Sequence, residues 1–150
     1  MPGFDSQSIA AMSPQELAQL VKATSDGDIK AAMAGPDRGP ILEEVFGRFP
    51  TMFNADNAAG VDKQINFRVT GGPEESTDTY GVAIKDGTCT VEKDPAGEGD
   101  VSLMMGPPDF FKLVTGSGNP VMMAMTGKIK VRGDVGLAQS FAKYFSIPKA

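Results

Sequence analysis

The stretch that decides the fold is DKQINFRVTGGPEESTDTYGVAIKDGTCTVE, residues 62–92. Hydrophobic and polar residues alternate within it in three runs, at 62–70, 79–85 and 88–92. A period of two is typical of β-strands that bury one face and leave the other in water. Asp86-Gly87, between the second and third runs, is a strong signal for a tight hairpin turn. The stretch therefore predicts three strands of a largely antiparallel sheet.

Two more strands are predicted nearer the C-terminus, at 101–105 and 128–132, because the same alternation recurs there. Strict alternation means that each strand has one buried face and one face in water. The residues expected to point into the core are Ile65, Phe67, Val69, Tyr80, Val82, Ile84, Cys89, Val91, Val101, Leu103, Met105, Ile129 and Val131.

The N-terminal part of the chain is rich in alanine and is predicted to be helical. Ser13-Pro14-Gln15-Glu16 is a capping box with proline at the first helical position. Leu17, Leu20 and Val21 follow it on one face of the helix. If this stripe is exposed, it needs a partner surface. We expect Asp26-Gly27-Asp28 to break the helix.

A domain boundary is predicted near residue 40. A second short helix is expected around 29–34, and Pro36-Asp37-Arg38-Gly39-Pro40 follows it as the clearest linker in the sequence. We therefore divide the chain into a helical N-terminal extension, 1–40, and a main domain, 41–150. The extension either docks on the main domain or serves in association with another chain.

Helices are also predicted on both sides of the strands. One spans 41–49 and stops at Pro50, and Met52 and Phe53 extend it into a short turn or second helix. Two more are expected at 107–116 and 119–127, each with proline near its start and glycine at its end. A last helix is expected from Asp134 to Phe145, carrying Leu137, Phe141, Tyr144 and Phe145 on one face.

The composition excludes several classes of function. The 150 residues carry a formal net charge of −5 without a cluster of basic residues, so we expect no nucleic-acid partner. The chain has no histidine, which removes the most common general base and metal ligand. Its single cysteine, Cys89, allows neither an intrachain disulfide nor a thiolate zinc site.

No group of residues has the pattern of a catalytic or cofactor site. Carboxylates such as Asp109 and Asp134 are accounted for by helix starts. Gly127-Lys128 resembles the end of a phosphate-binding loop, but Met122 stands where a glycine is needed and Ile129 where serine or threonine is needed. We therefore expect no catalytic residue, no metal and no cofactor.

Methionines are concentrated late in the chain. Five of the nine lie between residues 104 and 125, together with two adjacent phenylalanines. Met122, Met123 and Met125 cannot share one helical face, because successive residues are about 100° apart around a helix. We expect an arc that wide to be buried on more than one side, or to face a cavity as well as the sheet. Flexible methionines suit ligands of variable shape, but they also simply pack cores, and both alternatives stay open here.

From about Glu44 to Phe145 the chain resembles the sterol carrier protein type-two family. The pieces that carry the resemblance follow in the family's order with consistent spacing. They are Phe49-Pro50, Ala59-Gly60-Val61-Asp62, Ile65-Asn66-Phe67-Arg68-Val69, Tyr80-Gly81-Val82, Asp86-Gly87-Thr88-Cys89, Gly99-Asp100-Val101, Asp109-Phe110-Phe111 with Leu113 and Gly116, and Asn119-Pro120 with MTGKIKVRGD at 125–134. The last piece is the most specific.

The resemblance implies an α+β fold in which a five-stranded, largely antiparallel sheet carries helices on one face and encloses an apolar tunnel. It also implies that the tunnel takes a sterol, a fatty acid or a fatty acyl-CoA. From the resemblance and from hydrophobicity, the expected lining is Phe46, Phe53, Phe67, Leu103, Met105, Phe110, Phe111, Val114, Met122, Met123, Met125, Phe141 and Phe145. The last helix is a candidate lid.

The main expectation is thus a non-catalytic lipid carrier. Two alternatives stay open: an accessory or catalytic domain that presents an acyl or steroid substrate to an enzyme, and a ligand-free interaction module whose core is full. The chain shows no signal peptide, no hydrophobic run near the roughly 20 residues of a membrane span, and no peroxisomal tail, so we expect it in the cytoplasm.

Two partner expectations remain. The outer side of the fifth predicted strand carries three alternating basic residues, Lys128, Lys130 and Arg132. Because these could attract phosphate headgroups, we expect at most transient contact with a membrane surface. A solvated edge strand explains them more simply. A homodimer through the N-terminal helices is the second expectation.

Overall fold

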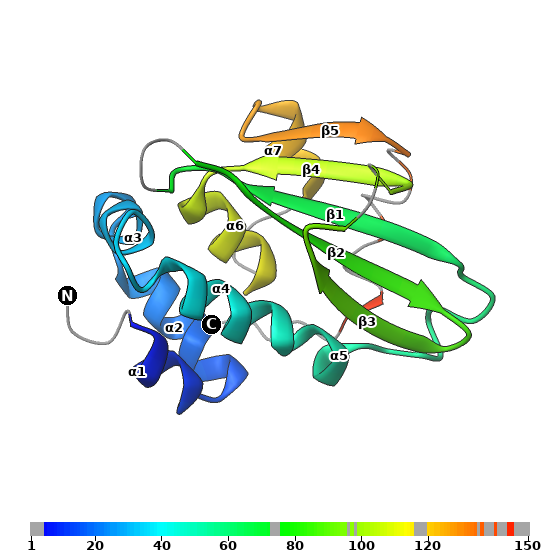
Figure 1. Ribbon diagram of the computed structural model, residues 1–150, viewed down its shortest axis with the longest axis horizontal. Helices are drawn as coiled ribbons and strands as arrows, with labels where there is room; N and C mark the ends of the chain where they lie inside the picture. The colour runs from blue at the N-terminus through cyan, green and yellow to red at the C-terminus, as the bar shows by residue number, and fades with distance from the viewer. Residues whose placement is uncertain are drawn as a thin grey trace.

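The structure is a computed structural model, shown as a ribbon in Figure 1. It describes residues 5–72, 76–95, 97, 99–115, 120–134, 136, 140 and 144–145. The helices are α1 (Ser6–Ala10), α2 (Pro14–Ala23), α3 (Asp26–Met33), α4 (Arg38–Gly47), α5 (Phe49–Met52), α6 (Pro107–Val114) and α7 (Pro120–Met125). The strands are β1 (Lys63–Val69), β2 (Asp78–Lys85), β3 (Thr88–Lys93), β4 (Val101–Met105) and β5 (Ile129–Gly133).

The strands form one five-stranded sheet in the order β3-β2-β1-β4-β5. The β1–β4 pair is parallel, and the other three pairs are antiparallel. The predicted α+β fold with a largely antiparallel sheet is therefore confirmed. At the hairpin between β2 and β3, Asp86 has φ of 53° and Gly87 has φ of 73°. Two positive φ angles in a two-residue loop are what a type I′ turn requires, which is why Asp-Gly suits this place.

One face of the sheet is covered by helices, and the alternation of the strands decides which face that is. Ile65, Phe67 and Val69 of β1 are completely buried, as are Val82 and Ile84 of β2. Helices α1, α2 and α3 gather beyond one end of the sheet, and α4 and α6 lie between them and the strands (Figure 1). Residues of α2, α3 and α4 belong to the same hydrophobic cluster as the strands.

The N-terminal stripe is buried within the chain itself. Leu17 is 4% exposed and Val21 is 2% exposed, and Leu20 is partly buried against the same core. Helix α2 contacts α6, so the extension is docked on the main domain. The stripe is therefore not exposed and needs no partner surface, and of the two alternatives for the extension the structure shows docking on the main domain. The homodimer and the division of the chain at residue 40 stay predictions.

Two local predictions in this region are wrong. Asp26-Gly27-Asp28 does not break a helix but forms the first turn of α3. The side chain of Ser25 accepts a hydrogen bond from the backbone N–H of Asp28 over 3.2 Å. The acidic side chains of Asp26 and Asp28 lie in the first turn, where their negative charge interacts favourably with the helix dipole and stabilises the helix. The predicted linker is shorter than expected, because α4 already begins at Arg38.

The predicted last helix lies mostly outside the described residues, which include neither Leu137 nor Phe141. Where the chain is described, the backbone N–H of Asn54 donates to the carbonyl oxygen of Tyr144 over 2.7 Å. Phe145 forms an isolated antiparallel bridge with Phe53. The C-terminal part of the chain therefore returns to the segment that follows α5.

Arg38 is a buried cation, 4% exposed, that joins the helices to the sheet. Its Nε donates to a carboxylate oxygen of Asp78 over 2.6 Å. Its Nη1 donates to the carbonyl oxygens of Met33 at 3.2 Å and Thr70 at 3.1 Å. Its Nη2 donates to the carbonyl oxygen of Val69 over 2.6 Å. One guanidinium thus ties the end of α3 to the end of β1 and the start of β2.

We predict that Arg38→Met lowers the free energy of unfolding by about 3–5 kcal/mol, because it leaves a carboxylate and three carbonyl groups without their donor. Urea denaturation measures the loss. Lys112→Met is the control: Lys112 lies 3.1 Å from Asp26 in a more exposed ion pair, and its removal should cost at most about 1 kcal/mol. Equal losses in the two variants would contradict the role given to Arg38.

Candidate functional site

Aromatic rings fill the space between the helices and the inner face of the sheet. Phe46 of α4 is the centre of this group, which we call the aromatic cluster. Its ring centroid lies 4.2 Å from that of Tyr80 and 5.1 Å from that of Phe110. The rings of Phe49 and Phe67 lie 5.2 Å and 5.8 Å away. Four separate elements, α5, β1, β2 and α6, therefore meet at one phenylalanine of a fifth.

Most of the residues predicted to line an apolar tunnel surround this cluster or lie next to it. Those that the structure buries are Phe46, Phe67, Leu103, Met105, Phe110, Phe111, Val114, Met123 and Phe145. Phe53 is partly buried, and its ring lies 5.9 Å from that of Phe145. Phe141 lies outside the described residues.

The methionines of α7 depart from the expectation. Met123 is 6% exposed, whereas Met122 is 58% and Met125 is 78% exposed. The expectation that this arc is buried on more than one side, or faces a cavity, is therefore wrong for Met122 and Met125. The physical reason is that α7 is short and lies beside β5, so that Met123 is buried while Met122 and Met125 are on the exposed side of the helix. Whether the exposed pair contacts a ligand stays a prediction.

Tyr80 brings a polar atom into the aromatic cluster. The residue is 3% exposed, and its hydroxyl has no hydrogen-bond partner among the described residues. Burial raises the pKa of Tyr80 to about 12, and the charges of Glu43, Asp78 and Asp94 act in the same direction against a smaller opposite effect of Arg38. The phenol therefore stays protonated at neutral pH. Its place in the β2 pattern predicted the burial, but no sequence signal predicted the lack of a partner.

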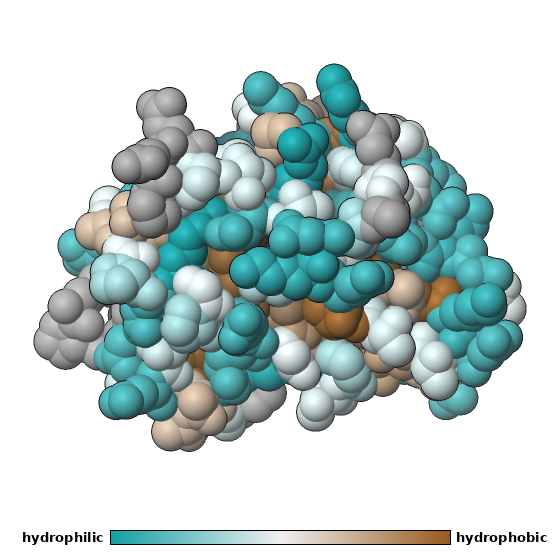
Figure 2. Space-filling view, viewed as in Figure 1, coloured by the Kyte–Doolittle hydropathy of each residue, from teal (hydrophilic) through white to brown (hydrophobic). Residues whose placement is uncertain are grey.

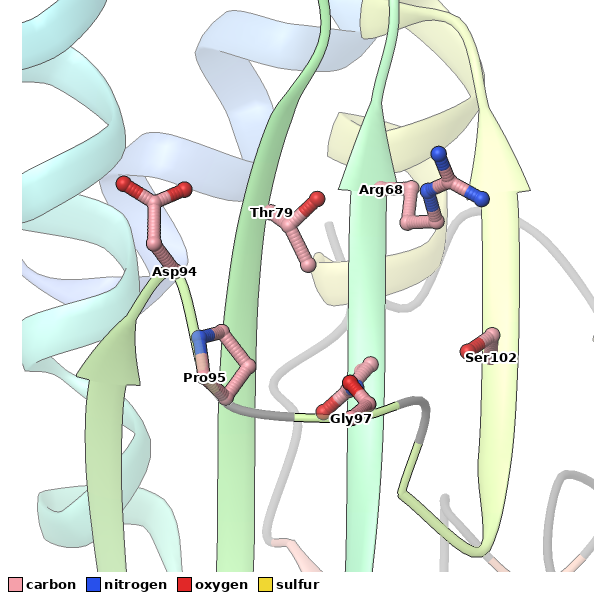
Figure 3. A pocket seen from close by; sticks show the side chains of 7 residues that line it. Arg68, Thr79, Asp94, Pro95, Gly97 and Ser102 are labelled. Atoms are coloured by element: carbon pink, nitrogen blue, oxygen red, sulfur yellow. The ribbon is translucent and has the colours of Figure 1, made fainter.

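A second feature lies on the outer face of the sheet. It is a polar pocket of about 300 Å³ lined by Asn66, Arg68, Thr79, Asp94, Pro95, Gly97 and Ser102 (Figure 3). The segment after β3 folds back over this face, and the side-chain amide of Asn66 donates to the carbonyl oxygen of Gly97 over 3.1 Å. Because the walls are polar, the pocket offers hydrocarbon no shelter from water.

The outer face is less exposed than strict alternation predicted. Asn66 is 1% exposed and Ser102 is 6% exposed, so the expectation of a face in water is wrong at these positions. A Cβ atom on Gly81 would lie 2.8 Å from the ring of Pro95, which shows how closely the folded-back segment approaches β2. This approach depends on contacts distant in sequence, which a period of two does not report.

The surface in Figure 2 is mostly hydrophilic, and hydrophobic residues show only in small areas between polar ones. Among the described residues, no group of histidine, cysteine or acidic side chains is arranged to hold a metal ion. Cys89 is buried, and burial raises the pKa of its thiol to about 11, so it is a poor nucleophile. None of the helices in the described part of the chain combines the length and hydrophobicity of a membrane crossing.

Comparison with known proteins gives consistent matches. The model of the SCP-2 sterol transfer family matches residues 47–146. Hydroxysteroid dehydrogenase-like protein 2 of Xenopus tropicalis is 32% identical over 115 residues, which are 76% of this chain and 27% of that protein. Sterol carrier protein 2 of Homo sapiens is 35% identical over 72 residues, 48% of this chain and 13% of that protein. The chain thus spans about a quarter or less of these relatives.

A solved structure shows that the fold is shared. Sterol carrier protein 2 from Yarrowia lipolytica, in its apo form, superposes with a TM-score of 0.56 at 24% identity. The superposition covers 75% of this chain and 94% of the yeast chain.

We predict that mild peroxide oxidises Met122 and Met125 well before Met123 and Met33, because only the first two sulfurs are exposed. Peptide mass spectrometry after short exposure gives the order. Repeating the peroxide treatment with lipid present tests whether Met122 and Met125 contact bound lipid, because a residue covered by lipid would be oxidised more slowly. Equal oxidation of Met123 and Met125 without lipid would contradict the placement of α7.

The free energy of unfolding should fall as the pH rises from about 10 to about 12. In this window the unfolded chain loses the phenolic proton of Tyr80 and the folded chain keeps it. The contribution is complete below pH 10, and its loss is roughly 2 kcal/mol at pH 12 and approaches roughly 3 kcal/mol above that pH. Tyr80→Phe should remove this part of the slope in urea denaturation, and Tyr144→Phe should not. Identical slopes in wild type and Tyr80→Phe would show that the buried phenol has no such effect.

Proposed function

The chain belongs to the SCP-2 sterol transfer family, and we propose that it is a non-catalytic carrier that holds one lipid between the sheet and the helices. The observation that carries the proposal is the aromatic cluster, a large hydrophobic interior shared by α4, α5, α6, β1 and β2. The lipid is a sterol, a fatty acid or a fatty acyl-CoA, held by the buried residues predicted as the lining. The exposed methionines of α7 belong to the site only if lipid covers them.

Binding in this place requires the rings to separate, because they contact one another in the structure. Each ring pair contributes about 0.5–1.5 kcal/mol beyond its buried area, so losing the four pairs around Phe46 costs about 2–6 kcal/mol. Burying a methylene gains roughly 0.8 kcal/mol, so a sixteen-carbon tail gains about 12 kcal/mol before other costs. The lipid also restores contacts on the ring faces. After the entropy of association, micromolar to nanomolar affinity is physically reasonable.

A second candidate function follows from the similarity to hydroxysteroid dehydrogenase-like protein 2. In this version the chain holds an acyl or steroid substrate and presents it to an enzyme, and the lipid site is the same. A ligand-free interaction module is the third candidate, and the contacts among the rings are what favour it. We place the carrier in the cytoplasm with at most transient contact with membrane surfaces.

Lipid uptake tests the carrier directly, and the chain is suited to it because it contains no tryptophan. Phe53→Trp places one reporter at the partly buried edge of the interior, beside Phe145. We predict that one equivalent of palmitate or cholesterol, added to delipidated protein, shifts the emission of this tryptophan. Thr90→Trp puts the same reporter on an exposed position of β3 and should not respond.

The outcomes separate the candidates. Saturation at one lipid per chain with a response only in Phe53→Trp supports the interior site. A response in Thr90→Trp alone would move binding to the outer face of the sheet. No uptake of either lipid at micromolar concentrations would overturn the carrier and the substrate-presenting version together, and would leave the interaction module.

A further inference from the structure

The hydroxyl of Tyr80 is the unexplained polar atom of the hydrophobic interior. It is buried without a hydrogen-bond partner among the described residues, although buried polar groups are almost always paired. The ring it belongs to is stacked on Phe46 at 4.2 Å with an angle of 14° between the planes. A phenylalanine would make the same stack without an unpaired hydroxyl. Packing alone therefore does not account for tyrosine at this position.

We propose that the Tyr80 hydroxyl is the polar anchor of the lipid site and donates a hydrogen bond to a neutral oxygen of the bound lipid, a hydroxyl or an ester or thioester carbonyl. The proposal rests on the proposed function, because it assumes that lipid enters the aromatic cluster. The hydroxyl has no partner within the described part of the chain, and the lipid oxygen supplies one.

The position of Tyr80 suits this role. It lies on the inner face of the sheet, directly opposite Phe67 of β1 in the antiparallel register. The ring of Phe46 is stacked on that of Tyr80, and the ring of Phe110 is also stacked on Phe46. A lipid that separates Phe46 from Tyr80 therefore meets the hydroxyl and the hydrophobic rings at the same time. The rings hold the hydrocarbon, and the hydroxyl fixes the depth and direction of its polar end.

The charges around Tyr80 select the kind of oxygen. Glu43, Asp78 and Asp94 place more negative than positive charge near the phenol, and Arg38 offsets only part of it. Arg38 already donates to Asp78 and to backbone carbonyls, so it is not free to pair with a ligand carboxylate. Glu43 and Asp94 are exposed and screened by water, so burial is the stronger constraint. A carboxylate at the buried Tyr80 hydroxyl would have no free cation to pair with, because Arg38 is engaged, and burying it would be costly. A neutral oxygen accepts the hydrogen bond without this cost.

Matched lipid pairs test the proposal. Hexadecanol is compared with hexadecane, and cholesterol with cholestene, its analogue without the hydroxyl, each by displacement of a fluorescent lipid. For each pair we compare the ratio of the affinity for the oxygen-containing lipid to the affinity for the hydrocarbon. We expect this ratio to be about tenfold larger in wild type than in Tyr80→Phe. Tyr80→Phe should still bind the hydrocarbon members at least as tightly as wild type, since its hydrophobic surface is intact.

Tyr144→Phe is the matched control, because it removes the hydroxyl of the only other tyrosine in the chain. It should keep the wild-type preference. Thermal unfolding of ligand-free Tyr80→Phe at or above the wild-type Tm shows that the variant folds. If wild type displaces no fluorescent lipid, the proposed function fails. If wild type binds and Tyr80→Phe keeps the full preference for the alcohol, the anchor is wrong while the carrier stands. Tighter binding of palmitate than of hexadecanol would overturn the selection for a neutral oxygen.

Discussion

The contact of Phe46 with four other rings is the constraint on which the rest of the structure depends. These rings come from α5, β1, β2 and α6, so the distance between helices and sheet is set where they meet. The hydrophobic part of these contacts has no direction, and a hydrocarbon tail can take the place of a phenylalanine ring without leaving a polar group unpaired. This property suits the proposed carrier, which must be stable without lipid and must open to take it up.

Two buried polar groups, Arg38 and Tyr80, differ in how far their hydrogen bonds are satisfied. Arg38 donates four hydrogen bonds, and it joins the end of α3 to the end of β1 and the start of β2. The charge of Arg38 acts on the phenol of Tyr80, but the Tyr80 hydroxyl has no hydrogen-bond partner among the described residues. A satisfied buried group rigidifies its surroundings, and an unsatisfied one is costly until something pairs with it. Under the proposal for Tyr80, the frame around the interior is fixed while one polar position inside it pairs with the ligand.

The fold could be predicted from sequence because the period of two leaves each strand a single way to bury its hydrophobic side. Helix boundaries were less accessible: Asp26-Gly27-Asp28 looks like a break, yet Ser25 caps a helix there. Arg38 was missed because its partners are mostly carbonyl groups, which any residue carries. Asn66 was expected in water, but a distant segment covers it. The exposure of Met125 likewise depends on which elements lie beside α7, and helical periodicity contains no information about that.

The most direct measurement is of contacts between protons of a bound lipid and those of the protein, by isotope-filtered nuclear Overhauser spectroscopy on delipidated protein with one equivalent of palmitate or cholesterol. The account predicts contacts from the hydrocarbon to the rings of Phe46, Phe67 and Phe110. Contacts confined to Met125 or to the outer face of the sheet, with the ring-to-ring contacts unchanged, would contradict it.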